Sequence, residues 1–125
     1  IQIYLDIGSI EKAQSHIQEA LQRSQKNDER AWEGLSWITL GRILSKTEQP
    51  QIEKAKESIL KGIEIVEELK LKPYSAVGYL CMGELYSDTG QREKAIENLL
   101  KANVMFKEMA MDYWLAKTNR VMKKL

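Results

Sequence analysis

The tripeptide Glu-Lys-Ala occurs three times in this chain, at residues 11–13, 53–55 and 93–95, so successive copies are separated by 42 and then by 40 positions. Gly41 and Gly83 repeat at the first of these two separations. A fixed period of this length is the signature of an array of similar structural units. Three further sets of positions keep this register: Trp32, Tyr74 and Trp114; Trp37 and Tyr79; Leu40 and Met82.

The periodicity inside each unit is helical. Apolar and small residues recur at steps of three and four, which place them on one face of an α-helix. The chain contains only two prolines, so long helices are favoured. The two-residue difference between the periods predicts a longer loop within residues 44–53. We expect an all-α fold of antiparallel neighbours, with seven helices over residues 1–6, 10–25, 29–46, 51–70, 73–88, 92–108 and 112–124.

Residues that commonly start or end helices stand between these segments. Asn27-Asp28 offers an N-terminal cap for the helix that follows. Pro50 and Pro73 stand where a first helical position is expected, because the missing N–H costs nothing there. Gly8 and Gly90 are expected to supply the left-handed residue that commonly ends a helix.

Charge and cysteine content narrow the class of protein. Nineteen basic residues face eighteen acidic ones, without the basic excess that a nucleic-acid binder usually shows. Cys81 is the only cysteine, so no intrachain disulfide forms and a reducing cytoplasm fits. The sequence contains no run of 18 apolar residues, the length needed to span a membrane. The chain opens on Ile1 in mid-pattern, from which we expect a fragment of a longer protein.

The repeated positions resemble the tetratricopeptide repeat, whose pattern is Trp, Leu-Gly, Tyr, then Ala, a large apolar residue and Ala. The second unit carries Trp37, Leu40, Gly41, Leu44, Ala55, Ile59 and Gly62, and the third carries Tyr79, Met82, Gly83, Tyr86, Ala95, Leu99 and Ala102. The period of 40 to 42 residues exceeds the family's usual 34. The resemblance implies a right-handed superhelical solenoid of antiparallel helix pairs.

A single domain over residues 1–125 follows from this register. It divides into a partial repeat at 1–26, repeats at 27–70 and 71–109, and a capping helix at 110–125. Asn119 and Lys123 stand where the other units have an aromatic residue and glycine, as suits the polar outer face of a terminal cap.

The small residues of the pattern have a packing role. Gly41, Gly83, Ala13, Ala55 and Ala95 are expected to let neighbouring helix backbones approach closely. A larger side chain at either glycine should force a helix pair apart, at a cost of ~1–3 kcal/mol or more.

Catalytic motifs are missing from the sequence. No phosphate-binding glycine loop is present, and one histidine with one cysteine gives no metal-ligand spacing. His16 and Cys81 lie two repeats apart, so we expect no nucleophilic pair, no enzyme, no cofactor and no metal. His16 is expected at a helix flank, and Cys81 as a small buried hydrophobe rather than a reactive thiol.

The resemblance implies a binding groove along the first helices of successive pairs. Its candidate residues are Leu35, Ile38, Thr39, Arg42, Lys46, Val77, Leu80, Cys81, Glu84, Asp88, Lys117, Arg120 and Lys124. An extended peptide or a helix with apolar anchors and mixed charge could lie in it, and the alternative is that these side chains merely cover an inner surface. Family members that clamp a C-terminal carboxylate use lysine and asparagine donors at positions where this chain has Ile38, Arg42, Leu80 and Cys81. A carboxylate clamp of this kind is therefore not expected.

The expected function is therefore that of a protein–protein interaction scaffold. Its partner would be another protein or peptide, or another domain of the same chain, with no nucleic acid and no membrane. Residues 106–114 resemble the ends of arrays in bacterial signalling proteins, which suggests a regulatory segment of such a protein. Two alternatives stay open: a small-molecule sensor, and self-association as a homodimer through the apolar N-terminal end at residues 1–7.

Overall fold

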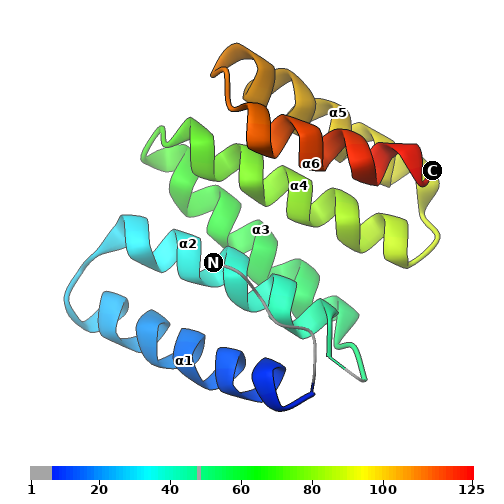
Figure 1. The fold of residues 1–125 in the computed structure, drawn as a ribbon. Coiled ribbons are helices and arrows are strands. Elements are labelled where there is room, and N and C mark those ends of the chain that lie inside the picture. Colours follow the sequence, from blue (N-terminus) through cyan, green and yellow to red (C-terminus); the bar gives the residue numbers. More distant parts are fainter. Residues whose placement is uncertain (1–6, 48) are drawn as a thin grey trace. The chain divides into compact units, whose positions relative to one another are not determined.

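The computed structural model describes residues 7–47 and 49–125, and this part of the chain contains helices and no strands. The helices are α1 (Ile7–Lys26), α2 (Arg30–Ser45), α3 (Ile52–Glu68), α4 (Lys72–Asp88), α5 (Arg92–Glu108) and α6 (Asp112–Lys123) (Figure 1). The all-α helical-repeat prediction is confirmed. The additional helix expected over residues 1–6 lies outside the described residues.

The helices form two compact units, which divide after Leu69. In the first unit α1 packs on α2 and α2 on α3. In the second unit α4 packs on α5, α5 packs on α6, and α6 also touches α4. The division of the chain into repeats at 1–26, 27–70, 71–109 and 110–125 stays a prediction.

Glycines bring α2 and α3 into backbone contact at two places. A Cβ atom added to Gly41 would lie 2.6 Å from the carbonyl oxygen of Ala55 and 3.0 Å from the backbone nitrogen of Ile59. A Cβ on Gly62 would lie 2.5 Å from the carbonyl oxygen of Gly34. The close approach expected at Gly41 and Ala55 is confirmed, and Gly34 and Gly62 form a second close approach that was not predicted from the sequence.

In the second unit α4 and α5 approach at Gly83. A Cβ there would lie 2.5 Å from two side-chain carbons of Leu99, which is fully buried. Phe106 at the other end of α5 is also fully buried, and its ring stacks on Trp114 of α6 with centroids 6.0 Å apart. These contacts hold α6 against α5. Asn119 accepts a hydrogen bond of 2.7 Å from the side-chain amide of Asn103, so the polar position expected in the cap has a polar partner.

A left-handed residue ends three of the helices in the same way. Asp28, Gly90 and Ala110 have φ values of 56°, 75° and 54° after α1, α4 and α5. The next backbone N–H in each case donates to a carbonyl five residues back, at 2.8 Å, 2.8 Å and 2.9 Å. This pattern is the Schellman motif, which satisfies carbonyls that a helix end leaves without partners. The prediction for Gly90 is confirmed.

Three expectations about helix ends are corrected. Asn27-Asp28 does not cap α2: Asp28 ends α1, and Glu29 is the N-cap residue, without a side-chain cap hydrogen bond. Gly8 lies inside α1 rather than after a helix, because α1 already begins at Ile7. Pro50 lies one residue before the N-cap of α3, where Gln51 precedes Ile52. Pro73 does stand in the first turn of α4.

The longer loop expected within residues 44–53 is present. The link between α2 and α3 spans residues 46–51, whereas that between α4 and α5 spans residues 89–91. Thr47 organises the longer link, because its hydroxyl lies 3.2 Å from the carbonyl oxygen of Leu44 and 3.1 Å from that of Gln49.

Candidate functional site

The α2 part of the predicted face lies along one side of that helix. Leu35, Thr39, Arg42 and Lys46 follow one another at steps of three and four and are half-buried. The Thr39 hydroxyl donates to the carbonyl of Leu35 at 2.9 Å, so this hydroxyl is partly engaged by its own helix. Ile38 is only 1% exposed and packs toward α3, where its Cγ1 would lie 2.6 Å from a Cβ added to Gly62. A partner on this side would therefore meet mainly the other four residues.

The α4 and α6 parts repeat this arrangement in the second unit. Val77 and Glu84 of α4 are half-buried and Asp88 is exposed, whereas Leu80 and Cys81 are 1% and 5% exposed. On the contacting helix α6, Arg120 is exposed, as is Lys124 at the C-cap. The ammonium group of the half-buried Lys117 lies 5.3 Å from the ring centroid of Trp114. The accessible side chains of this unit thus combine acidic groups on α4 with basic groups on α6.

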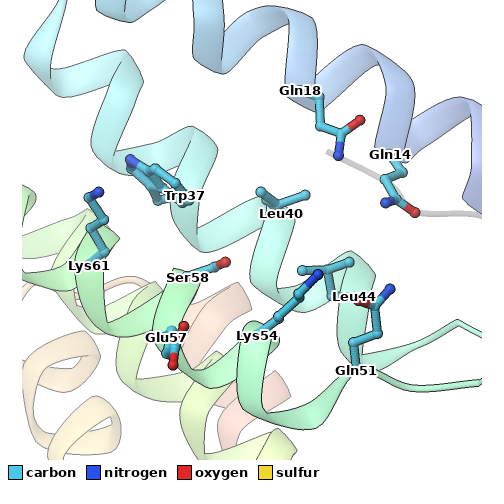
Figure 2. Close-up of a pocket in the computed structure, with 10 residues that line it drawn as sticks. All are labelled: Gln14, Gln18, Trp37, Leu40, Leu44, Gln51, Lys54, Glu57, Ser58 and Lys61. Atoms are coloured by element: carbon cyan, nitrogen blue, oxygen red, sulfur yellow. The ribbon is translucent and has the colours of Figure 1, made fainter.

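A pocket of about 490 Å³ opens on the opposite side of α2, between α1, α2 and α3 (Figure 2). Its lining comprises two glutamines of α1, three residues of α2, the link residue Gln51 and four residues of α3. These are Gln14, Gln18, Trp37, Leu40, Leu44, Gln51, Lys54, Glu57, Ser58 and Lys61. This pocket was not predicted, because the resemblance to the tetratricopeptide repeat places binding on the other side of α2.

In each of the two helix pairs, α2 with α3 and α4 with α5, a lysine of the second helix lies over an aromatic ring of the first helix. The Lys61 ammonium group lies 4.5 Å from the ring centroid of Trp37, and that of Lys101 lies 4.5 Å from the ring centroid of Tyr79. A cation over an aromatic face is attracted by the ring quadrupole. The indole Nε1 of Trp37 is buried and has no hydrogen-bond partner among the described residues. This orphaned donor lies at the edge of the pocket and is a polar group whose burial is uncompensated.

Neither a metal cluster nor a membrane span is found in the part of the chain that the structure describes. Within residues 7–47 and 49–125, no three His, Cys, Asp or Glu side chains are placed to hold a metal ion. The described helices include none with the length and apolar character needed to cross a bilayer. Cys81 is buried in α4 and His16 is exposed on α1, as expected from their positions in the sequence.

Comparison with protein families matches residues 78–103 to the family described as Tetratricopeptide repeat. The chain carries a tetratricopeptide-like repeat. The matched span covers most of α4 and α5, including the close contact of Gly83 with Leu99. Neither the curated proteins nor the solved structures gave a match.

The repeat register contains a signal for the part of the pocket that lies on α3 and the link before it. Gln51, Lys54, Glu57 and Lys61 of the pocket recur one period later as Gln91, Lys94, Glu97 and Lys101. Four identical residues in one register indicate that the second helices of both pairs carry the same outer surface. The contribution of α1 to the pocket had no such signal, because it depends on how α1 packs against α2.

Proposed function

We propose that this chain is a protein-binding module in which each compact unit offers partners the exposed side chains of its part of the predicted face, on α2 in the first unit and on α4 and α6 in the second. The match of α4 and α5 to the tetratricopeptide repeat carries this proposal, since such repeats generally mediate protein–protein interactions. The side chains of this face support it, because half-buried apolar groups stand beside charged ones of both signs. Interfaces of this composition combine a packed centre with a polar rim.

The partner that fits best is a protein or peptide segment with apolar anchors and charges of both signs. In the first unit Leu35 offers apolar contact. In the second unit Val77 offers apolar contact, Arg120 and Lys124 offer cationic groups, and Asp88 offers an anionic one. Helix-borne side chains present such groups in a fixed geometry, which lowers the entropy cost of binding. We further propose that the module serves a regulatory role within a larger signalling protein of the bacterial cytoplasm. Residues 106–114 support that role, through their resemblance to the ends of arrays in bacterial signalling proteins.

Selection of binders from a displayed library of random peptides, followed by affinity measurement on variants, tests the proposal. Leu35→Glu should weaken at least tenfold the peptides that bind the first unit, and Arg120→Glu should do the same for those that bind the second unit. Leu60→Glu and Lys107→Glu are matched controls with the same chemical changes on the second helices, and they should leave affinity within twofold. If the face variants bind the peptides as well as the unchanged chain, the assignment of this face is wrong.

A further inference from the structure

Three glutamine side-chain amides contribute to the lining of the pocket between α1, α2 and α3. Figure 2 shows Gln14 and Gln18 extending from α1 on one side, with Gln51 beside α3 on the other. Over residues 7–47 and 49–125, the structure shows no hydrogen bond to any of these three amides. Each glutamine amide offers two donor hydrogens and an acceptor oxygen. An extended peptide presents the same groups along its edges, whereas a helix already satisfies its own internally.

The centre of the pocket is apolar. Leu40 and Leu44 of α2 are buried at its floor, and the ring of Trp37 lies beside them (Figure 2). The indole N–H of Trp37 is a buried donor without a partner among the described residues. The floor can therefore take one apolar side chain of a bound peptide, while the amides at the rim take its backbone.

The charge of the lining favours an anionic group. Lys54 and Lys61 face Glu57 alone, so the lining carries one excess positive charge. Lys61 already lies over the ring of Trp37. Lys54 has no ring contact, ion pair or hydrogen bond of its side chain within the described part of the chain. It is the cation of this pocket that remains for a ligand.

Comparison of the two helix pairs explains why Lys54 is available. Its counterpart in the second pair, Lys94, lies 5.6 Å from the ring centroid of Tyr86. The position of Tyr86 is occupied in the first pair by Leu44, one period earlier in the same register. The exchange of tyrosine for leucine removes both the bulk of a ring and the partner of the lysine. In the pair formed by α2 and α3, the smaller Leu44 therefore leaves space beside the ammonium group of Lys54, which has no ring to contact there.

From these observations we infer that the pocket between α1, α2 and α3 binds an extended peptide segment. In this segment an apolar and an acidic side chain stand two residues apart and face the pocket, while the residues next to them face away. The apolar side chain lies on Leu40 and Leu44, the acidic one pairs with Lys54, and the glutamine amides bind the backbone. This site is separate from the proposed partner face, because Trp37, Leu40 and Leu44 occupy the side of α2 opposite Leu35, Thr39 and Arg42.

The test is an NMR titration of the full chain with the pentapeptide Ser-Leu-Ser-Glu-Ser, acetylated at one end and amidated at the other. In an extended peptide its leucine and glutamate side chains lie on one face. The indole signal of Trp37 and the side-chain amide signals of Gln14, Gln18 and Gln51 should shift together. The indole signals of Trp32 and Trp114 serve as internal references that should stay in place.

Two variants separate the pocket from general charge attraction. Lys54→Glu should weaken the peptide at least fivefold, and replacing the peptide's glutamate by glutamine should do the same. Lys94→Glu is the matched control in the second pair and should change affinity less than twofold. Leu44→Tyr introduces the residue that the second pair already accommodates at this position, so the fold should survive while binding is lost.

Several outcomes would overturn the inference. One is a Trp37 indole signal that does not move at millimolar peptide. Another is equal weakening by Lys54→Glu and Lys94→Glu. Free acetate that shifts the same signals as strongly as the peptide would show a site for small anions instead. Loss of peptide shifts in Leu35→Glu with retention in Lys54→Glu would place this peptide on the partner face, whereas the reverse result would support the pocket and leave the partner face to its own test.

Discussion

Replacing Gly41 with alanine should destabilise the first unit, because the added methyl group meets backbone atoms. The Cβ would lie 2.6 Å from the carbonyl oxygen of Ala55 and 3.0 Å from the nitrogen of Ile59. Neither atom can move by a change of side-chain rotamer, so α2 and α3 must separate by several tenths of an ångström along their contact. Overpacking of this kind costs roughly 1–3 kcal/mol or more, and alanine recovers at most about 1 kcal/mol through its higher helix propensity.

Gly83→Ala provides the comparison within the same chain. Its added methyl group meets two side-chain carbons of Leu99 at 2.5 Å, while the nearest backbone atom is 3.4 Å away. Because one of these carbons is Cγ of the fully buried Leu99, relief requires rotation about the Cα–Cβ bond, at a cost of about 0.5–1.5 kcal/mol for a strained rotamer, which the helix propensity of alanine partly offsets. We therefore expect Gly41→Ala to lower the free energy of unfolding by about 1–2 kcal/mol more than Gly83→Ala.

Urea unfolding followed by far-ultraviolet circular dichroism measures this difference. The midpoint should fall further for Gly41→Ala than for Gly83→Ala, with similar slopes if the mutation alters only the folded state. If Gly41→Ala unfolds at the same urea concentration as the unchanged chain, the two backbones are not in the contact that the structure shows.

Three further changes test other parts of the fold. Ala110→Gly should raise the melting temperature in a thermal scan, because φ at this residue is 54° and a left-handed conformation costs a residue with a Cβ roughly 1 kcal/mol; an unchanged or lower value would contradict this. Phe106→Ala should lower the free energy of unfolding by about 3–5 kcal/mol, as expected for a fully buried phenylalanine. In a Trp32→Phe, Trp37→Phe background, where Trp114 is the remaining tryptophan, it should also increase quenching of the fluorescence by acrylamide. Lys101→Met retains the apolar stem but loses the charge over Tyr79, so it should lower stability in urea by about 0.5–1 kcal/mol, and by less in high salt. A loss well above about 2 kcal/mol, the level reached by desolvated cation–π pairs, would show that the lysine does more than cover the ring.

The sequence predicted the close approach at Gly41 because small residues recurred in a fixed register. The contact between Gly34 and Gly62 was missed, although Gly34 and the buried Ala76 also share one position of the repeat and are both small. The repetition of a small residue was visible in the sequence, but Gly34 is matched by Ala76 rather than by a second glycine. Small size, rather than glycine itself, is what the register preserves at this position.

The left-handed residues that end helices show a different limit of the sequence. Asp28, Lys70 and Ala110 share φ values of 54–58° and occupy the same position in successive repeats. Their side chains have nothing in common, so a search for glycine or asparagine finds none of them. Schellman hydrogen bonds of the preceding helix hold Asp28 and Ala110 in place, so backbone constraints override the local preference of the residue.

The candidate sites were predictable to different degrees. The resemblance to the tetratricopeptide repeat named positions on the first helices, and it included Ile38 and Leu80, which are almost fully buried. Periodicity separates one side of a helix from the other, but it does not decide how deeply each residue lies. The pocket required the three-dimensional packing of α1 against α2, together with the exchange of Tyr86 for Leu44 between the two pairs.

The tryptophans give the chain a set of built-in spectroscopic reporters. Trp32 at the start of α2 is 60% exposed, Trp37 keeps its indole nitrogen away from solvent, and Trp114 stacks on Phe106. Two of these fluorophores belong to the first compact unit and one to the second. Chains that retain a single tryptophan would therefore report the melting of each unit separately, without any added label, and would show whether the two halves unfold as one cooperative body or in succession.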